Sequence, residues 1–176
     1  MYKMAEAGCL RDASVQNLEV SGRADMSNGT LAYKLPVINV STATYTLNAN
    51  QSGSIVYITD LDAAVTLPTA EAGLNYTFVC GGIMAGAKIN AATGDCFWGN
   101  LKVTSTTDDK TSSDEVVATG GAVADSNVAT LTGTSDKSGG QPGDTINCVA
   151  VDATHWLLSG VLTTSHAAPA ALEILG

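Results

Sequence analysis

The sequence predicts an all-β protein, with a compact sandwich-like or barrel-like domain of short antiparallel strands and an extended N-terminal arm. The 18 glycines and many threonines and serines favour short strands joined by turns. A hydrophobic content of 45% with 14% charged residues excludes a disordered, highly charged chain. No apolar run approaches the roughly 18 residues that a membrane-spanning helix needs, so we expect no membrane contact.

The chain is predicted to divide into three segments. Its 176 residues suit one domain of ordinary size rather than two. We expect an N-terminal arm over residues 1–34, a compact β domain over 35–165 and a C-terminal tail over 166–176.

The arm contains short apolar runs separated by turn signals, in the stretch NLEVSGRADMSNGTL at 17–31. Asn28-Gly29 between such runs is a hairpin signal, so the arm is predicted to form short β-hairpin units. These runs are too thin to build a core, and we expect them to pack on another subunit or a partner. An irregular arm that touches only its own domain is an equal alternative. The predicted partner-binding residues are Leu10, Val15, Leu18, Val20, Met26 and Leu31.

The centre of the compact domain, 54–80, is predicted to be a β-meander. Its expected strands are 55–58, 64–67 and 75–80. The first is a continuous apolar run, typical of a strand covered on both faces, and Pro68 ends the second. The third alternates, with Tyr76, Phe78 and Cys80 on one face.

Further strands are predicted on both sides of this meander. They are 37–40, 42–47, 88–92, 96–103, 116–118 and 128–132, and a closing hairpin of 144–151 and 155–162 around the turn 152–154. Gly81, Gly82 and Gly86 match no dinucleotide or phosphate fingerprint and indicate a loop or bulge. Trp98 is expected in the core, with a ligand-stacking role as the less favoured alternative.

The charge and cysteine patterns exclude several kinds of site. A net charge of -9 without a basic stripe argues against a nucleic-acid partner. Cys9, Cys80, Cys96 and Cys148 are spaced too widely for zinc ligands, and the acidic run 105–115 lacks the calcium-loop pattern. We therefore predict no metal and no cofactor. No apolar signal region follows the N-terminus, which favours a reducing compartment. Cys80, Cys96 and Cys148 lie in apolar strand patterns and are expected to be free and buried, with a disulfide or a reactive thiol as the less favoured alternative.

Catalysis is not predicted. His155 and His166 are the only histidines, and no GxSxG elbow or comparable local group accompanies them. We expect His155 to be a hydrogen-bonded surface or edge residue.

Three stretches resemble a recurrent β-domain of tailed-phage virion proteins. They are LPTAEAGLNYTFVC, INAATGDCFWG and GDTINCVAVDATHWLLSG, and the resemblance covers roughly residues 47–161. Such domains occur in capsid decoration (cement) proteins, head fibres and tail-fibre-like proteins. The arm stretch at 17–31 also looks like the small β-units that begin many phage fibre proteins.

The resemblance implies a non-enzymatic, homotrimeric virion component on the capsid surface, assembled in the host cytoplasm. The short chain fits a decoration protein better than a full fibre. Its expected partner is the major capsid protein, reached by the arm. The alternative is a head-fibre or tail-fibre module that binds host-surface glycans, with Trp98 or Trp156 beside Asp95 or His155 as the candidate site.

Overall fold

The computed structural model describes residues 34–105, 114–118, 128–132, 139–165 and 174–175. Its contacts divide the chain into two compact units, Met1–Lys34 and Leu35–Gly176. The six predicted partner-binding residues of the arm lie outside the described residues, and so do most of the predicted tail and most of the acidic run.

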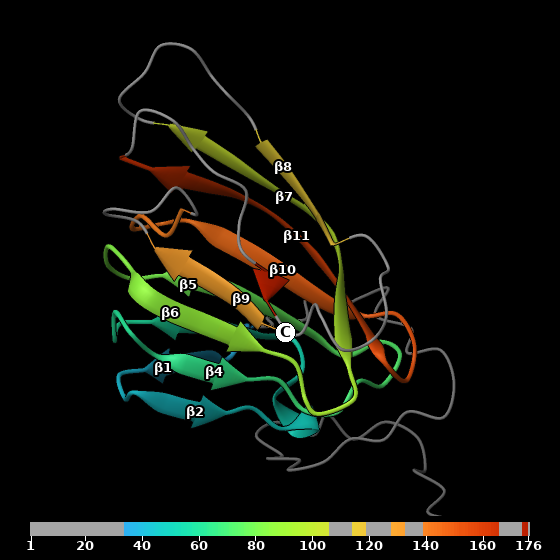
Figure 1. Cartoon of the computed structure of the whole chain (residues 1–176). Helices are drawn as coiled ribbons and strands as arrows, with labels where there is room; N and C mark the ends of the chain where they lie inside the picture. The colour runs from blue at the N-terminus through green and yellow to red at the C-terminus, as the bar shows by residue number, and fades with distance from the viewer. Residues whose placement is uncertain (1–33, 106–113, 119–127, 133–138, 166–173, 176) are drawn as a thin grey trace, which may run out of the picture. The chain divides into compact units, whose positions relative to one another are not determined.

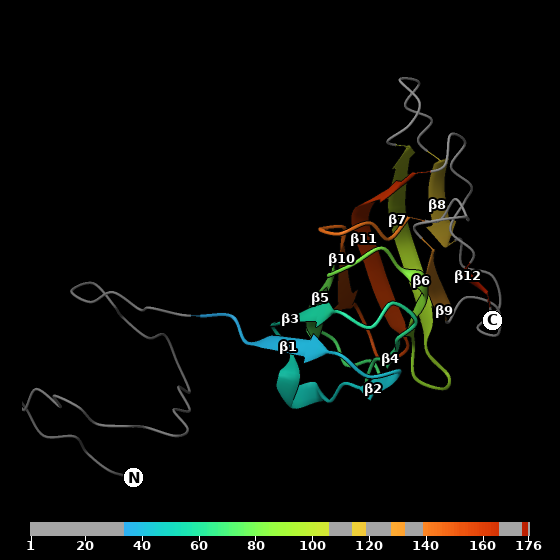
Figure 2. The ribbon, with the colours of Figure 1, turned by 90° about the vertical axis from the view of Figure 1, so that its left-hand side faces the viewer.

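The second unit consists of two mixed β-sheets, so the all-β prediction is confirmed (Figures 1 and 2). The seven-stranded sheet has the order β1 (Val37–Val40), β3 (Ser54–Ile58), β5 (Asn75–Cys80), β10 (Thr145–Ala150), β11 (His155–Thr164), β7 (Cys96–Ser105) and β8 (Asp114–Ala118). The five-stranded sheet has the order β12 (Ile174–Leu175), β9 (Val128–Thr132), β6 (Ala85–Asn90), β4 (Ala64–Thr66) and β2 (Thr44–Thr46). One short 3-10 helix, η1 (Ala49–Gln51), follows β2.

The chain crosses between the two sheets after each strand from β1 to β6, so the antiparallel meander predicted for 54–80 is wrong. β1, β3 and β5 are parallel neighbours in one sheet, and β2, β4 and β6 are parallel neighbours in the other. The turn at Asp60–Asp62 therefore carries the chain across to the other sheet instead of folding it back. β11 and β7 are also parallel, whereas the pairs β5–β10, β10–β11, β7–β8, β6–β9 and β9–β12 are antiparallel.

Buried side chains from both sheets form one apolar cluster. β5 shows the predicted alternation, because Tyr76, Phe78 and Cys80 are buried. β3 does not have two covered faces: Val56 and Ile58 are buried, but Tyr57 is exposed. The strand thus has one face in the core and one outside.

A predicted bulge and the predicted closing hairpin are both present. The register of β6 against β9 shifts between Ala85 and Ala87, around Gly86. β10 and β11 pair from Thr145↔Val161 to Ala150↔Trp156, with the turn at 152–154. β11 then runs beside β7 from His155↔Cys96 to Thr164↔Ser105, which fixes the position of Trp98.

The loop before β10 is anchored by a buried carboxylate, which the sequence analysis did not identify. Asp144 Oδ2 accepts hydrogen bonds from the backbone N–H groups of Gly140 (2.9 Å), Gln141 (2.9 Å) and Thr163 (2.7 Å). Its Oδ1 accepts one from the Thr163 hydroxyl at 2.7 Å. Asp144 therefore ties this loop to β11.

Candidate functional site

The two tryptophans have opposite environments. Trp156 is fully buried beside Tyr76, with ring centroids 5.9 Å apart, so it offers no surface to a ligand. Trp98 is 36% exposed, so the prediction that it packs in the core is wrong. Its neighbour Phe97 is fully buried, and successive side chains of a strand point to opposite faces. Only one of these two adjacent aromatic residues can therefore face inward.

Trp98 is stacked on His155 from the neighbouring strand. The two ring centroids are 3.7 Å apart and the ring planes meet at 30°. The parallel register of β7 and β11 places Trp98 opposite Leu157, one step along the same face from His155. The sheet therefore positions an exposed aromatic side chain against an imidazole.

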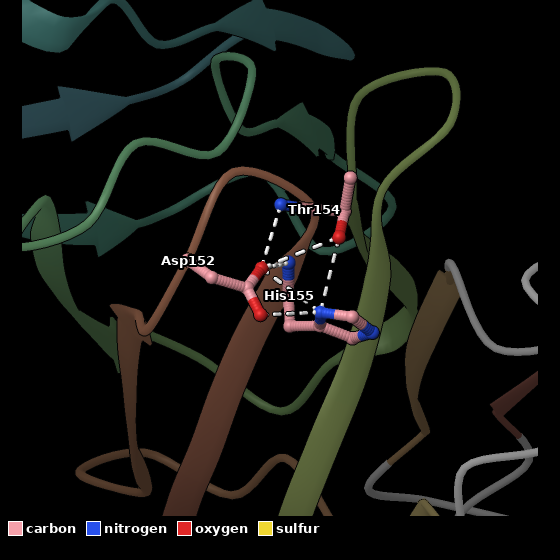
Figure 3. Close-up of polar contacts among 3 residues, drawn as sticks. All are labelled: Asp152, Thr154 and His155. Carbon is pink, nitrogen blue, oxygen red and sulfur yellow. Dashed lines mark hydrogen bonds and ion pairs between the residues drawn. The ribbon is translucent and has the colours of Figure 1, made fainter.

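Asp152 holds His155 in place through the turn between β10 and β11 (Figure 3). Asp152 Oδ1 accepts the backbone N–H groups of Thr154 and His155, each at 2.8 Å. Asp152 Oδ2 lies 2.7 Å from His155 Nδ1. Since a carboxylate only accepts, Nδ1 carries the proton, which leaves Nε2 of a neutral ring as an acceptor. His155 is hydrogen-bonded, as expected from the sequence, but it is partly buried and begins an interior strand of the seven-stranded sheet instead of lying at its surface or edge.

The same hydrogen bonds set the charge of this turn. The Thr154 backbone N–H, followed by the side-chain and backbone hydrogen bonds of His155, lowers the pKa of Asp152 below its ordinary value. Asp152 thus carries a negative charge beside the His155–Trp98 stack at neutral pH. The Thr154 hydroxyl contacts Nδ1, the nitrogen that Asp152 already faces, at 3.0 Å. Because this hydroxyl lies on Nδ1 and not on Nε2, the imidazole is not placed to act as a base that activates Thr154 as a nucleophile.

Asp95, the other acid in the predicted glycan site, has a structural role. It is buried, and its Oδ2 accepts the Ala70 backbone N–H at 2.7 Å. This bond ties the turn before β7 to the segment after β4. The residues brought together at the surface are therefore Trp98, Asp152, Thr154 and His155.

The described cysteines are free and buried, as predicted for them. Burial, with a contribution from the Asp144 charge, raises the pKa of Cys80 to about 12. Burial also raises the pKa of Cys148. Neither is a thiolate near neutral pH, so neither is a ready nucleophile. Cys9 lies outside the described residues.

Within the described ranges, no group of three or more His, Cys, Asp or Glu side chains is arranged to hold a metal ion. No helix in the same part of the chain is long and apolar enough to cross a membrane.

Comparison of the chain with protein-family models, with known proteins and with solved structures finds no significant match.

Proposed function

We propose that the chain is a non-enzymatic virion structural protein, a homotrimeric capsid decoration (cement) protein with a β-sandwich domain and an N-terminal arm. The observation that carries the proposal is the place of the phage-like stretches in the fold. Four of their five aromatic residues, Tyr76, Phe78, Phe97 and Trp156, lie together in the core of a single two-sheet unit, and the fifth, Trp98, is exposed. These stretches thus act as one structural module, as the resemblance requires.

The proposed mechanism is mechanical. The two-sheet unit sits on the capsid surface, and the arm, through Leu10, Val15, Leu18, Val20, Met26 and Leu31, reaches across neighbouring copies of the major capsid protein. Apolar burial contributes about 25 cal/mol per Å² before association costs. Three arms in one trimer bind simultaneously, so weak single contacts give tight attachment. The shell gains stability because each trimer bridges several subunits.

Shell binding by arm variants tests this proposal. Leu18, Val20 and Met26 are replaced together by Ser, and the control replaces Glu19 and Asp25 by Ser in the same stretch. Both proteins are mixed with empty shells of the major capsid protein encoded in the same genome and sedimented. The apolar variant is expected to stay in the supernatant and the control to sediment with the shells. Equal binding of both would contradict the role of the arm.

A second candidate function is glycan binding by a head-fibre or tail-fibre module, which the exposed Trp98 favours. A sugar ring stacks on an aromatic face while its hydroxyl groups bond to nearby acceptors, here the Asp152 carboxylate and His155 Nε2. Glycan-array binding and tryptophan quenching test it with Trp98→Ala, and Leu61→Ala, at an exposed apolar residue in the turn after β3, is the control. Selective loss with Trp98→Ala would favour the fibre module over the decoration protein.

A further inference from the structure

Exposed apolar side chains gather on the outer face of the seven-stranded sheet. Ten large apolar side chains are exposed among the described residues, and six of them lie on this one face. The outer face is defined here by Val37, Tyr57, Trp98, Val149, Leu157 and Val161. The outward positions of the five-stranded sheet are different, with Thr44, Thr46, Thr66, Lys88 and Asn90 among them. Exposed apolar side chains are thus concentrated on one side of this unit.

The strand register makes these side chains neighbours. Val149 lies opposite Leu157, and Leu157 lies opposite Trp98, so three exposed apolar residues form one row. A second row joins Tyr57 on β3 to Val161 on β11 through Val79 and Thr145. In the row between them, the Thr77 hydroxyl donates to Asn147 Oδ1 at 3.0 Å. The side chains of these two polar residues are therefore bonded to each other.

Charge on the outer face is confined to its β7 border, where the exposed Lys102 lies opposite Val161. The adjacent strands β1, β3, β5, β10 and β11 contain no Lys, Arg, Asp or Glu, although the chain carries a net charge of -9. Two copies of so acidic a chain repel each other, and the repulsion is weakest where both present uncharged surface. A basic partner protein would need acidic side chains on this face to bind to, and these five strands have none. Charge therefore favours another copy of the same chain as the occupant.

The face has about the area that such a contact needs. Neighbouring strands lie about 4.8 Å apart and residues on one face repeat about every 6.8 Å, so six strands and three rows span roughly 590 Å². Weak specific interfaces bury up to about 600 Å² per partner, and standard ones about 800 Å². The face alone is thus sufficient for an association that depends on concentration.

We propose that copies of this chain associate through the outer face, with Leu157, Val149, Val161 and Tyr57 at the centre of the contact. Trp98 lies at the border, beside the charged Asp152 turn, where a rim residue is expected. This inference rests on the homo-oligomer in the proposed function and names the surface that forms it. It does not require a capsid.

The test measures the mass of the full-length protein by light scattering and sedimentation velocity, from about 1 to about 200 μM and without shells. Leu157→Asp puts a negative charge on the outer face of every copy, so the contacting faces repel each other, and association is expected to weaken about a hundredfold. The double variant Val149→Thr with Leu157→Thr keeps strand-forming residues and is expected to weaken it about tenfold. Thr46→Asp, on an exposed position of the five-stranded sheet, is the matched control and is expected to leave the mass unchanged. Near-ultraviolet circular dichroism checks that each variant is folded, and the double variant decides the matter if Leu157→Asp does not fold.

A wild-type protein that stays monomeric over this range would overturn the inference, as would an oligomer that the outer-face variants leave intact. Shell sedimentation separates this result from the proposed function. A monomer that binds shells contradicts the inference and the proposed homotrimer but supports the decoration role. An oligomer that depends on the outer face but ignores shells supports the inference and contradicts decoration.

Discussion

Replacement of Asp144 should destabilise the two-sheet unit more than any exposed acid does. Asp144→Ala removes one acceptor that serves three backbone N–H groups and one hydroxyl. A donor left unsatisfied costs about 1–3 kcal/mol, and we take roughly 2 for the buried Gly140 N–H and roughly 1 for each partly buried N–H of Gln141 and Thr163. The expected loss in free energy of unfolding is therefore about 4 kcal/mol. Asp144→Asn keeps an acceptor oxygen but loses the charge, and should cost about 1–2 kcal/mol.

The assay is urea unfolding followed by tryptophan fluorescence and far-ultraviolet circular dichroism. Asp60→Ala is the control, because Asp60 accepts only one described N–H, that of Asp62, in an exposed turn at 3.1 Å. It should cost less than about 1 kcal/mol. If Asp144→Ala were no more destabilising than Asp60→Ala, the loop would not depend on this carboxylate and the reasoning would be refuted.

Three further predictions follow from the packing and the shifted pKa values. Gly99→Ala should lower the free energy of unfolding by more than about 3 kcal/mol, because φ is +119° and a Cβ would collide with the Leu158 carbonyl of the neighbouring strand β11. Gly94→Ala is the control: its φ is +92° but no atom lies within 4 Å of the added Cβ, so the loss measured by urea unfolding should be about 1 kcal/mol. The pKa of Cys80 is raised from 9.0 to about 12, so the unfolded chain loses this proton first and stability should fall between these pH values by about 1.4 kcal/mol per pH unit. Cys80→Ala should remove that contribution to the slope, whereas a slope unchanged by Cys80→Ala would contradict it. The pKa of Asp152 is lowered below 3.8, so its stabilising contribution is present above this pH and is lost as the pH falls through the lower folded value. Asp152→Asn should therefore show less acid destabilisation than the wild type in thermal melts, and identical acid profiles would argue against this.

Strand positions and many buried faces followed from the sequence because both depend on local pattern. The alternation at Tyr76, Phe78 and Cys80 fixes which side of β5 is buried, whatever strands lie next to it. The Pro68 signal is likewise local, and β4 ends just before it.

Strand pairing could not be predicted in the same way. The turn residues at Asp60–Asp62 show that the chain changes direction, but they do not show whether the next strand joins the same sheet or the other one. The structure places Val65 beside Tyr45 and Ile89 instead of beside Val56. Partners so far apart in sequence are selected by the shared core and not by a turn.

The surface site was predicted only in part. The sequence placed Trp98 near His155 as an alternative, but the apolar run around Phe97 and Trp98 did not show which ring faces inward. The absence of charge from five strands was visible in the sequence, yet their adjacency in one sheet was not. The anchoring role of Asp144 depends on contacts with Gly140 and Thr163 that form only in the folded chain.

The most direct test of the proposed function is sedimentation of the purified full-length protein with empty shells of its own major capsid protein, with the mass of the free protein measured in parallel. The account predicts a homotrimer that sediments with the shells at a fixed, saturable ratio and raises their resistance to heat. A protein that remains in the supernatant at every concentration would contradict the decoration role and shift the weight of the argument to glycan binding at Trp98.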